Sequence, residues 1–146
     1  MKAVLQRVKS ARVAVGGHEK ASIDKGFLLL VGIAREDTPD VVRAMARKIS
    51  KLRVFEDEQG KMNLDINEIG GKILSISQFT LLGNTDKGNR PGFDPAAPPD
   101  EAKKLWEDLN EELKKRGIPV AEGEFGAKME ITLVNDGPVT FVLNRS

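Results

Sequence analysis

The segment that most constrains the fold is a continuous apolar run at residues 26–33. It reads Gly-Phe-Leu-Leu-Leu-Val-Gly-Ile and contains no polar or charged side chain. A strand with one solvent-facing side alternates apolar and polar residues, whereas a strand that is apolar on both faces is covered on both. The run is far shorter than the roughly 20 apolar residues of a membrane span, so we expect no membrane association. It therefore predicts the central strand of a covered sheet.

Shorter patterned segments predict the other strands. Alternating apolar and polar residues, or β-branched runs bounded by turn residues, are typical of half-buried strands. By this criterion we expect an early pair at 3–9 and 12–15, and further strands at 18–23, 72–79, 129–133 and 139–143. Gly16 and Gly17 offer a turn, which places the only histidine, His18, in an exposed hairpin.

Two segments have apolar residues at helical spacing. The first begins after Thr38, a hydroxyl N-cap, with Pro39 at the first helical position. The second follows Pro98-Pro99 and ends before Gly117, with acidic residues in its first turn and basic residues in its last. The two apolar stripes consist of Val41, Val42, Met45, Ile49 and Leu52, and of Ala102, Leu105, Trp106, Leu109 and Leu113.

Together these elements predict a strand-rich α/β fold. At 146 residues the chain has the size of one ordinary domain. We expect a single domain over residues 1–146, in which two β layers are covered by the helices in a sandwich or barrel-like arrangement. The N-terminal residues lack the apolar segment that directs export, and the chain has no cysteine, which together suggest the cytoplasm.

The composition removes several kinds of catalytic chemistry. The chain has no cysteine, no tyrosine and one histidine, so a thiolate, a histidine-rich metal site and a histidine base are not expected. It lacks the phosphate-binding G-x-x-x-x-G-K-[ST] motif, and we expect neither a cofactor nor a metal. The net charge of +1 is not the basic excess of proteins held to nucleic acid mainly through phosphates, and we expect no DNA partner. Any catalysis must therefore use hydroxyls, main-chain dipoles, charged side chains or groups of the substrate itself.

Small polar residues end the predicted strand at 72–79. In Ser77-Gln78-Phe79-Thr80 an apolar run gives way to hydroxyls, an amide and main-chain N–H groups. If the pleat continues, Gln78 and Thr80 share a face with buried residues and form a pocket rim. The alternative is a strand end whose polar groups hydrogen-bond one another. Thr80 is a weaker candidate as a nucleophile than as a positioning group, because no base is evident near it in the sequence.

A second polar segment, Asn-Asp-Gly-Pro-Val-Thr at 135–140, lies between two predicted strands. Gly137 allows the main chain to approach a ligand closely, and Gly137-Pro138 is the kind of peptide bond in which the cis form costs little. Spacing alone favours an ordinary hairpin turn. A long polar loop also lies between residues 83 and 99, where Lys87 and Arg90 form either a basic patch or a solvated loop.

In order and almost end to end, these segments resemble the D-aminoacyl-tRNA deacylases. The matching motifs are Ala-Val-Leu-Gln-Arg-Val at 3–8, Arg-Val-Phe-Glu-Asp at 53–57, Gly-Lys-Met-Asn at 60–63, Ser-Gln-Phe-Thr-Leu at 77–81, Lys-Gly-Asn-Arg-Pro at 87–91, Ala-Ala-Pro-Pro at 96–99, Phe-Gly-Ala at 125–127 with Met129, and Asn-Asp-Gly-Pro-Val-Thr at 135–140. Two departures are Leu82-Gly83, where the family commonly has Tyr-Ala, and Gly92, where it often has serine.

The resemblance implies the fold of that family and a homodimeric enzyme. Its substrate is the ester that joins a D-amino acid, or glycine mischarged on tRNA-Ala, to the terminal adenosine of tRNA. The implied site consists of Ser77, Gln78, Phe79 and Thr80 around the ester, Phe125 and Met129 at the adenosine or the pocket wall, and Lys87 and Arg90 on the tRNA. Gly137-Pro138, in cis and braced by Arg7, would reach into the partner subunit's pocket and exclude L side chains with its carbonyls.

The resemblance leaves the route of hydrolysis open. With no activated nucleophile, the 2′-hydroxyl of the substrate can assist attack by water while main-chain N–H groups near Phe79 and Thr80 stabilise the oxyanion. Covalent catalysis by Thr80 ranks second. Two other functions remain: a non-catalytic RNA-binding dimer, and a free-standing editing domain like that of archaeal threonyl-tRNA synthetases. Pro138 argues against a related subfamily that carries Gly-Thr and accepts an L-amino acid.

Overall fold

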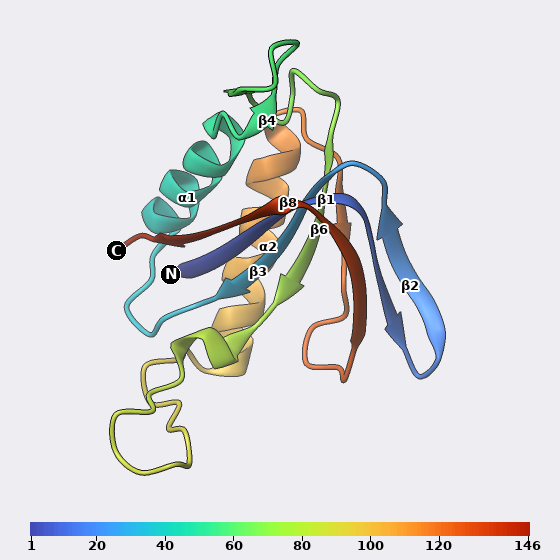
Figure 1. The fold of residues 1–146 in the computed structure, drawn as a ribbon. Coiled ribbons are helices and arrows are strands. Elements are labelled where there is room, and N and C mark those ends of the chain that lie inside the picture. The colour runs from blue at the N-terminus through green and yellow to red at the C-terminus, as the bar shows by residue number, and fades with distance from the viewer.

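A curled six-stranded sheet forms the centre of the computed structural model, which describes residues 1–146 (Figure 1). Its strands are β1 (Lys2–Val15), β2 (His18–Ile23), β3 (Gly26–Gly32), β6 (Lys72–Ser77), β7 (Val120–Glu122) and β8 (Glu130–Asn144). The strand order is β2-β1-β3-β6-β7, and β8 pairs with β1. A separate hairpin consists of β4 (Phe55–Glu56) and β5 (Met62–Leu64).

The apolar run is the central strand that the sequence predicts. β3 pairs antiparallel with β1 on one side and parallel with β6 on the other. All of its residues except the partly buried Leu30 are buried. Because β2 also contacts β6 and β7, the sheet curls into a nearly closed, barrel-like form. The strand-rich α/β fold expected from the sequence is confirmed.

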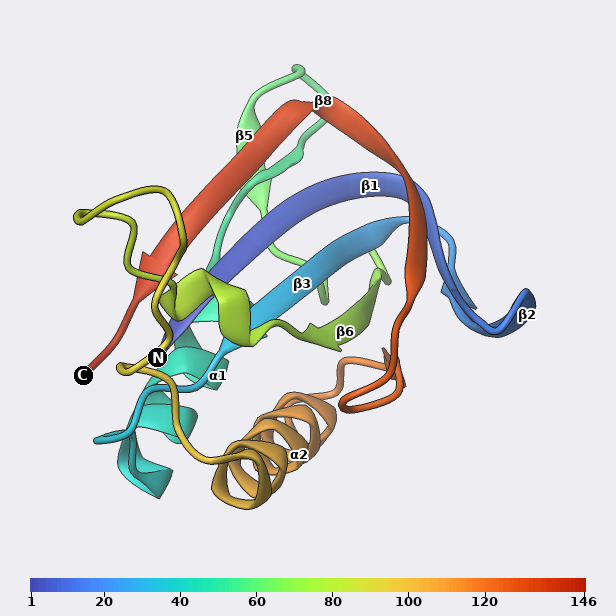
Figure 2. The same cartoon turned by 90° about the horizontal axis from the view of Figure 1, so that it is seen from below.

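Both helices cover one face of the sheet, while β8 arches over the opposite side (Figure 2). α1 (Pro39–Lys51) begins after Thr38, whose hydroxyl accepts a hydrogen bond from the N–H of Val41 at 3.4 Å. α2 (Pro99–Lys115) ends before Gly117, whose φ of +85° is the left-handed conformation that favours glycine. The predicted apolar stripes pack against β1 and β3 in the larger of two hydrophobic cores. Neither helix is long and apolar enough to cross a bilayer.

The second core fills the inside of the curl. It contains Val8, Ala11, Val13, Ile23, Leu28, Leu74 and Ile76, with residues of β8 packed against it. Leu28 faces this core, whereas its neighbours Phe27 and Leu29 face the helices. The alternating burial of β3 between two cores explains why every one of its side chains is apolar.

Three sequence predictions were wrong in detail, and three short strands were missed. The early pair at 3–9 and 12–15 is one continuous strand, β1, because β8 pairs with it along most of its length. The segments at 129–133 and 139–143 likewise belong to one strand, β8. The strand predicted at 72–79 ends at Ser77, and a 3-10 helix, η1 (Phe79–Leu82), follows. The short strands β4, β5 and β7 were not predicted, since two or three residues carry too little periodicity.

Candidate active site

The end of β6 delivers a polar segment to the surface of the sheet. The N–H of Gln78 donates to the carbonyl of Val31 at 2.7 Å, which is the last bond before the chain leaves the sheet and turns into η1. Gly32 lies beneath this turn, where an added Cβ would stand 2.3 Å from Leu82 Cδ2 and 3.1 Å from the carbonyl oxygen of Gln78. The missing side chain at residue 32 therefore lets η1 lie directly on β3.

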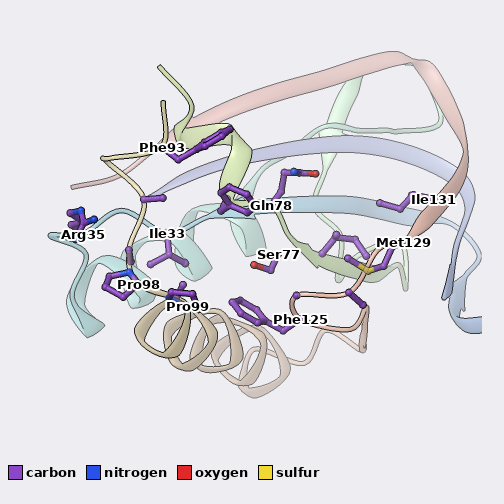
Figure 3. A pocket seen from close by; sticks show the side chains of 17 residues that line it. Ile33, Arg35, Ser77, Gln78, Phe93, Pro98, Pro99, Phe125, Met129 and Ile131 are labelled. Atoms are coloured by element: carbon purple, nitrogen blue, oxygen red, sulfur yellow. The ribbon is translucent and has the colours of Figure 1, made fainter. Parts of the chain in front are cut away.

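A pocket of about 600 Å³ opens beside this turn (Figure 3). Its 17 lining residues, 11 of them hydrophobic, come from the ends of β3 and β6, the loop before α2, the first turns of α2 and the segment that leads into β8. Five residues predicted from the sequence line it: Ser77, Gln78, Phe79, Phe125 and Met129. The structure thus brings together two segments that are about fifty positions apart in the chain.

Aromatic side chains shape two walls of the pocket. Phe79, of which 55% is exposed, lies edge-on to Phe93 with ring centroids 5.0 Å apart. Phe125 packs against Trp106 at 6.0 Å, and the indole Nε1 of Trp106 donates to the buried hydroxyl of Ser75 at 2.9 Å. The hydroxyl of Ser75 is therefore engaged by Trp106 outside the pocket. The serine of β6 that lines the pocket is Ser77.

Thr80 does not line the pocket, although it lies next to residues that do. Its hydroxyl accepts a hydrogen bond from the side-chain amide of Gln78. This contact matches the alternative in which polar groups at the strand end bond one another. The N–H groups of Phe79 and Thr80 open η1, and no main-chain carbonyl accepts from either. The turn therefore leaves two main-chain donors without a carbonyl partner next to residues that line the pocket.

The segment at 135–140 is a bulge inside β8 and not a hairpin turn. Gln6 faces Thr140 and Val8 faces Asn135, so a step of two residues along β1 corresponds to five along β8. The side chain of Asn135 spans the bulge, since it accepts from the N–H of Val139 at 2.8 Å and donates to the carbonyl of the same residue at 3.2 Å. The bulge is possible because this side-chain amide replaces main-chain pairing.

Arg7 anchors the bulge from the facing strand. Its side chain is 5% exposed and donates to the carbonyl of Asp136 at 2.8 Å and to that of Val54 at 2.7 Å. The peptide bond between Gly137 and Pro138 is cis, and both residues are exposed. Neither Arg7 nor these two residues line the pocket of their own chain. The two motifs predicted to act together are therefore apart within one subunit.

The loop between η1 and α2 projects from the body of the fold (Figure 1). Asn84 and Gly92 close its base through two mutual main-chain hydrogen bonds of 2.7 and 2.9 Å. Lys87 and Arg90 lie in the exposed tip, outside the pocket. His18 is exposed in the β1–β2 hairpin, as the sequence predicts. No group of three or more Asp, Glu and His side chains gathers into a metal-binding arrangement.

Sequence reasoning missed several of the residues that line the pocket, of which four have a clear structural reason. Phe93 lies in the long polar loop between residues 83 and 99. The length of this loop indicated a function, and an aromatic residue within it could have been singled out as a binding residue. Pro98 and Pro99 begin α2 and also line the pocket. The sequence predicted only their place at the start of the helix. Arg35 lies in the loop after β3, and nothing in its local sequence marks it.

The chain is similar to known proteins along its whole length. A family model described as D-Tyr-tRNA(Tyr) deacylase matches residues 4–144. The chain belongs to the D-aminoacyl-tRNA deacylase family. A relative of that name from Lactobacillus acidophilus is 53% identical over 99% of each chain, and one from Thermus aquaticus is 52% identical over 100% of this chain and 96% of its own.

Two solved structures share the fold of this chain. The structure of a c-Myc DNA unwinding element binding protein superposes with a TM-score of 0.92 at 42% identity, covering 99% of this chain and 98% of that one. A probable eukaryotic D-amino acid tRNA deacylase superposes with a TM-score of 0.85, covering 97% of both chains. At 16% identity the second match shows a shared fold alone.

Proposed function

We propose that this chain hydrolyses the ester between a D-amino acid and the 3′-terminal adenosine of tRNA, releasing the free amino acid and the tRNA. The observation that carries the proposal is the position of the pocket. A chain that matches the deacylase family from residue 4 to residue 144 places Ser77, Gln78 and Phe79 of its Ser-Gln-Phe-Thr motif in the wall of a pocket of about 600 Å³. The chain has no cysteine, and its one histidine, His18, lies outside the pocket, so the proposed reaction uses neither residue type as a nucleophile.

The pocket has the size and character that an aminoacyl-adenosine needs. A volume of about 600 Å³ falls within the usual range for small-molecule sites, which are mostly apolar with a few polar groups. Phe125 and Met129 offer an aromatic face and a thioether for contact with the base or with the pocket wall. Glycine esters, including glycine mischarged on tRNA-Ala, fit the same space, because a pocket that admits a D side chain also admits hydrogen.

The free donors of η1 suggest how the reaction proceeds. A developing oxyanion beside the turn would meet the N–H groups of Phe79 and Thr80, which have no main-chain acceptor. No histidine or carboxylate hydrogen-bonds to Thr80, so its hydroxyl lacks the adjacent base that a nucleophile requires. We therefore assign attack to water, assisted by the 2′-hydroxyl of the substrate, and give Thr80 a positioning role. Covalent catalysis by Thr80 is the second choice.

Selectivity for D-amino acids is proposed to depend on a second copy of the chain. Gly137 and Pro138 are exposed and lie outside the pocket of their own subunit, so in a homodimer they are free to enter the partner's pocket. β8 pairs with β1 alone and exposes Val134 by 50% and Val142 by 60%, which offers an apolar surface for that dimer. Main-chain carbonyls at the bulge would then exclude L side chains by contact, with Arg7 holding them in place.

The rest of the tRNA is proposed to contact the projecting loop through Lys87 and Arg90, both exposed. Each is a free cation at the tip of a segment whose base is closed by Asn84 and Gly92. Such contacts raise affinity for any tRNA without reading its sequence. Aminoacyl-tRNA is used in the cytoplasm, and we place the enzyme there.

The direct test is to incubate the purified chain with D-Tyr-tRNA and with L-Tyr-tRNA and to follow release of the amino acid. Hydrolysis of the D ester alone supports the proposal, and hydrolysis of Gly-tRNA-Ala extends it to the achiral substrate. Cleavage of an L ester would indicate a synthetase-type editing domain. Binding without turnover would indicate an RNA-binding dimer, with a duplex DNA of equal length as the control for charge alone.

A further inference from the structure

Arg35 is the only charged residue among the 17 that line the pocket. It lies at one end of the cavity, beyond Ile33 and Pro98 and opposite Met129 and Ile131 (Figure 3). Ser77 and Phe125 lie between the two ends. The cavity is therefore electrically asymmetric along its length: one end carries a guanidinium, and the remainder is apolar or neutral.

Main-chain contacts fix the position of Arg35. Its N–H donates to the carbonyl of Pro95 at 3.1 Å, and Ala34 and Ala96 form an antiparallel bridge. Its side-chain Nε donates to the carbonyl of Asp94 at 2.5 Å. The segment after β3 is thus tied to the segment before α2, and the guanidinium is held at the mouth of the pocket by one of its five N–H groups.

The charge of Arg35 has no partner in the protein. It takes part in none of the salt bridges. The contrast with α2 is clear, because Lys104, Lys114 and Lys115 each pair with an acidic side chain on that helix or beside it. With Nε committed to a carbonyl, the two terminal nitrogens of Arg35 remain as a planar fork, which matches the geometry of a phosphate.

We propose that Arg35 binds the phosphate on the 5′ side of the terminal adenosine and thereby sets the direction in which the aminoacyl-adenosine lies in the pocket. This inference rests on the proposed function. The end of an aminoacyl-tRNA carries two charges near the terminal ribose: the 5′ phosphodiester and the α-ammonium of the amino acid. A guanidinium attracts the first and repels the second. Arg35 is a positioning residue, since it touches the substrate away from the ester.

The test compares substrates that differ only in the phosphate. These are a 3′-O-(D-tyrosyl)-adenosine with a free 5′-hydroxyl, its 5′-monophosphate, and D-Tyr-tRNA. For Arg35→Ala we expect KM to rise about tenfold for the two phosphate-bearing substrates with little change in kcat, the size expected for loss of one charge-assisted hydrogen-bonded contact. The substrate with the free 5′-hydroxyl should show no change. Arg35→Lys should recover part of the loss, because it keeps the charge without the fork.

The matched control is Arg43→Ala, which removes an exposed arginine that pairs with Asp40 on α1. It should leave all three substrates unaffected. If Arg35→Ala raised KM equally for all three substrates, the role of Arg35 would be structural and the proposal would be overturned. If KM changed for none of them, Arg35 would not contact the phosphate, which would also overturn the proposal. Thermal unfolding of each variant shows whether the fold is kept.

A binding measurement separates this inference from the proposed function. We expect the unmodified chain to bind 5′-AMP about tenfold more tightly than adenosine, and Arg35→Ala to bind the two equally. That result would support the phosphate site even if no D ester were hydrolysed. Equal binding of AMP and adenosine by the unmodified chain would overturn it, whatever the activity.

Discussion

Arg7 donates from Nε to the carbonyl of Asp136 at 2.8 Å, which ties a buried side chain of β1 to the main chain of the β8 bulge. The same guanidinium donates to the carbonyl of Val54 at 2.7 Å, at the start of the β4–β5 hairpin. One side chain therefore holds three segments of the chain in a fixed arrangement.

We predict that Arg7→Lys destabilises the fold by about 1–3 kcal/mol, because an ammonium cannot serve both carbonyls and leaves a buried acceptor unpaired. Denaturant unfolding followed by circular dichroism measures the change. The control is Arg12→Lys, an exposed arginine on the same strand, which should stay within about 0.5 kcal/mol of the parent. Equal unfolding midpoints for the two variants would show that Arg7 does not brace the bulge.

Gly137 has no room for a side chain. An added Cβ would stand 2.4 Å from the N of Val139 and 2.6 Å from its Cγ2, so the bulge has to shift. We predict that Gly137→Ala lowers the ratio of kcat/KM for D-Tyr-tRNA over L-Tyr-tRNA by about tenfold or more, since a displacement near 1 Å is enough to spoil a steric filter. Gly92→Ala is the control, because nothing lies within 4 Å of its Cβ position. An unchanged ratio in Gly137→Ala would place the filter elsewhere.

The sequence predicted the elements of the fold better than their ends. An uninterrupted apolar run identified β3, and apolar residues at helical spacing identified both helices. Periodicity split β1 and β8 into separate strands. Each is continuous because it pairs with the other, and no local sequence pattern reveals that pairing. The turn to η1 after Ser77 was missed for the same kind of reason: Gly32, on another strand, supplies the space.

The site was predictable where the residues that form it are adjacent in sequence. Ser77, Gln78 and Phe79 follow one strand, and the change from apolar to polar residues marks them. Phe125 and Met129 were reached through family resemblance and not through pattern. Arg35 was not reached at all, because its place at the pocket is set by pairing between the segment after β3 and the segment before α2.

The carboxylate of Asp57 lies in the β4–β5 hairpin, and we expect it to make the stability of the fold depend on pH. Its carboxylate accepts from the N–H groups of Lys61 at 3.0 Å and Gln59 at 2.9 Å and from the amide of Asn63 at 3.2 Å. These hydrogen bonds hold the pKa of Asp57 below its usual value of 3.8, and the bond from the N–H of Lys61 contributes most. The folded carboxyl thus binds its proton less tightly than the unfolded one, so its stabilisation is present above pH 3.8 and is lost as the pH falls through the lowered pKa.

We accordingly predict that Asp57→Asn unfolds at a lower temperature than the parent near neutral pH, and that the difference narrows as the pH falls below 3.8. Thermal unfolding across a pH series measures it. Glu58→Gln removes a neighbouring exposed carboxylate that accepts no hydrogen bond in the hairpin, and should leave the acid dependence unchanged. A gap between Asp57→Asn and the parent that stays constant down to the lowest pH would contradict the assignment.

Gly32 supports the turn that carries Phe79 and Thr80. We predict that Gly32→Ala destabilises the fold by about 1–3 kcal/mol through overpacking against Leu82 and displaces η1. The kcat/KM for D-Tyr-tRNA should fall by about a hundredfold, as expected when reacting groups move by roughly 1 Å. Combining it with Leu82→Ala removes the side chain in closest contact and should restore part of the activity. Full activity of Gly32→Ala alone would mean that η1 does not position the reacting groups.

The two routes of hydrolysis predict opposite results. One uses Thr80 as a covalent nucleophile, and the other uses water assisted by the 2′-hydroxyl of the substrate. Thr80 Oγ1 accepts from Gln78, and no base bonds to it, so removal of the hydroxyl costs one hydrogen bond. Thr80→Val, which keeps the shape of the side chain, should retain kcat within about tenfold of the parent. A tRNA that ends in 2′-deoxyadenosine should react slower by about a hundredfold or more, the contribution typical of assisted proton transfer. If the deoxy substrate reacts normally and Thr80→Val is inactive, Thr80 is the nucleophile, and a burst of amino-acid-modified enzyme in rapid-quench experiments would identify the intermediate.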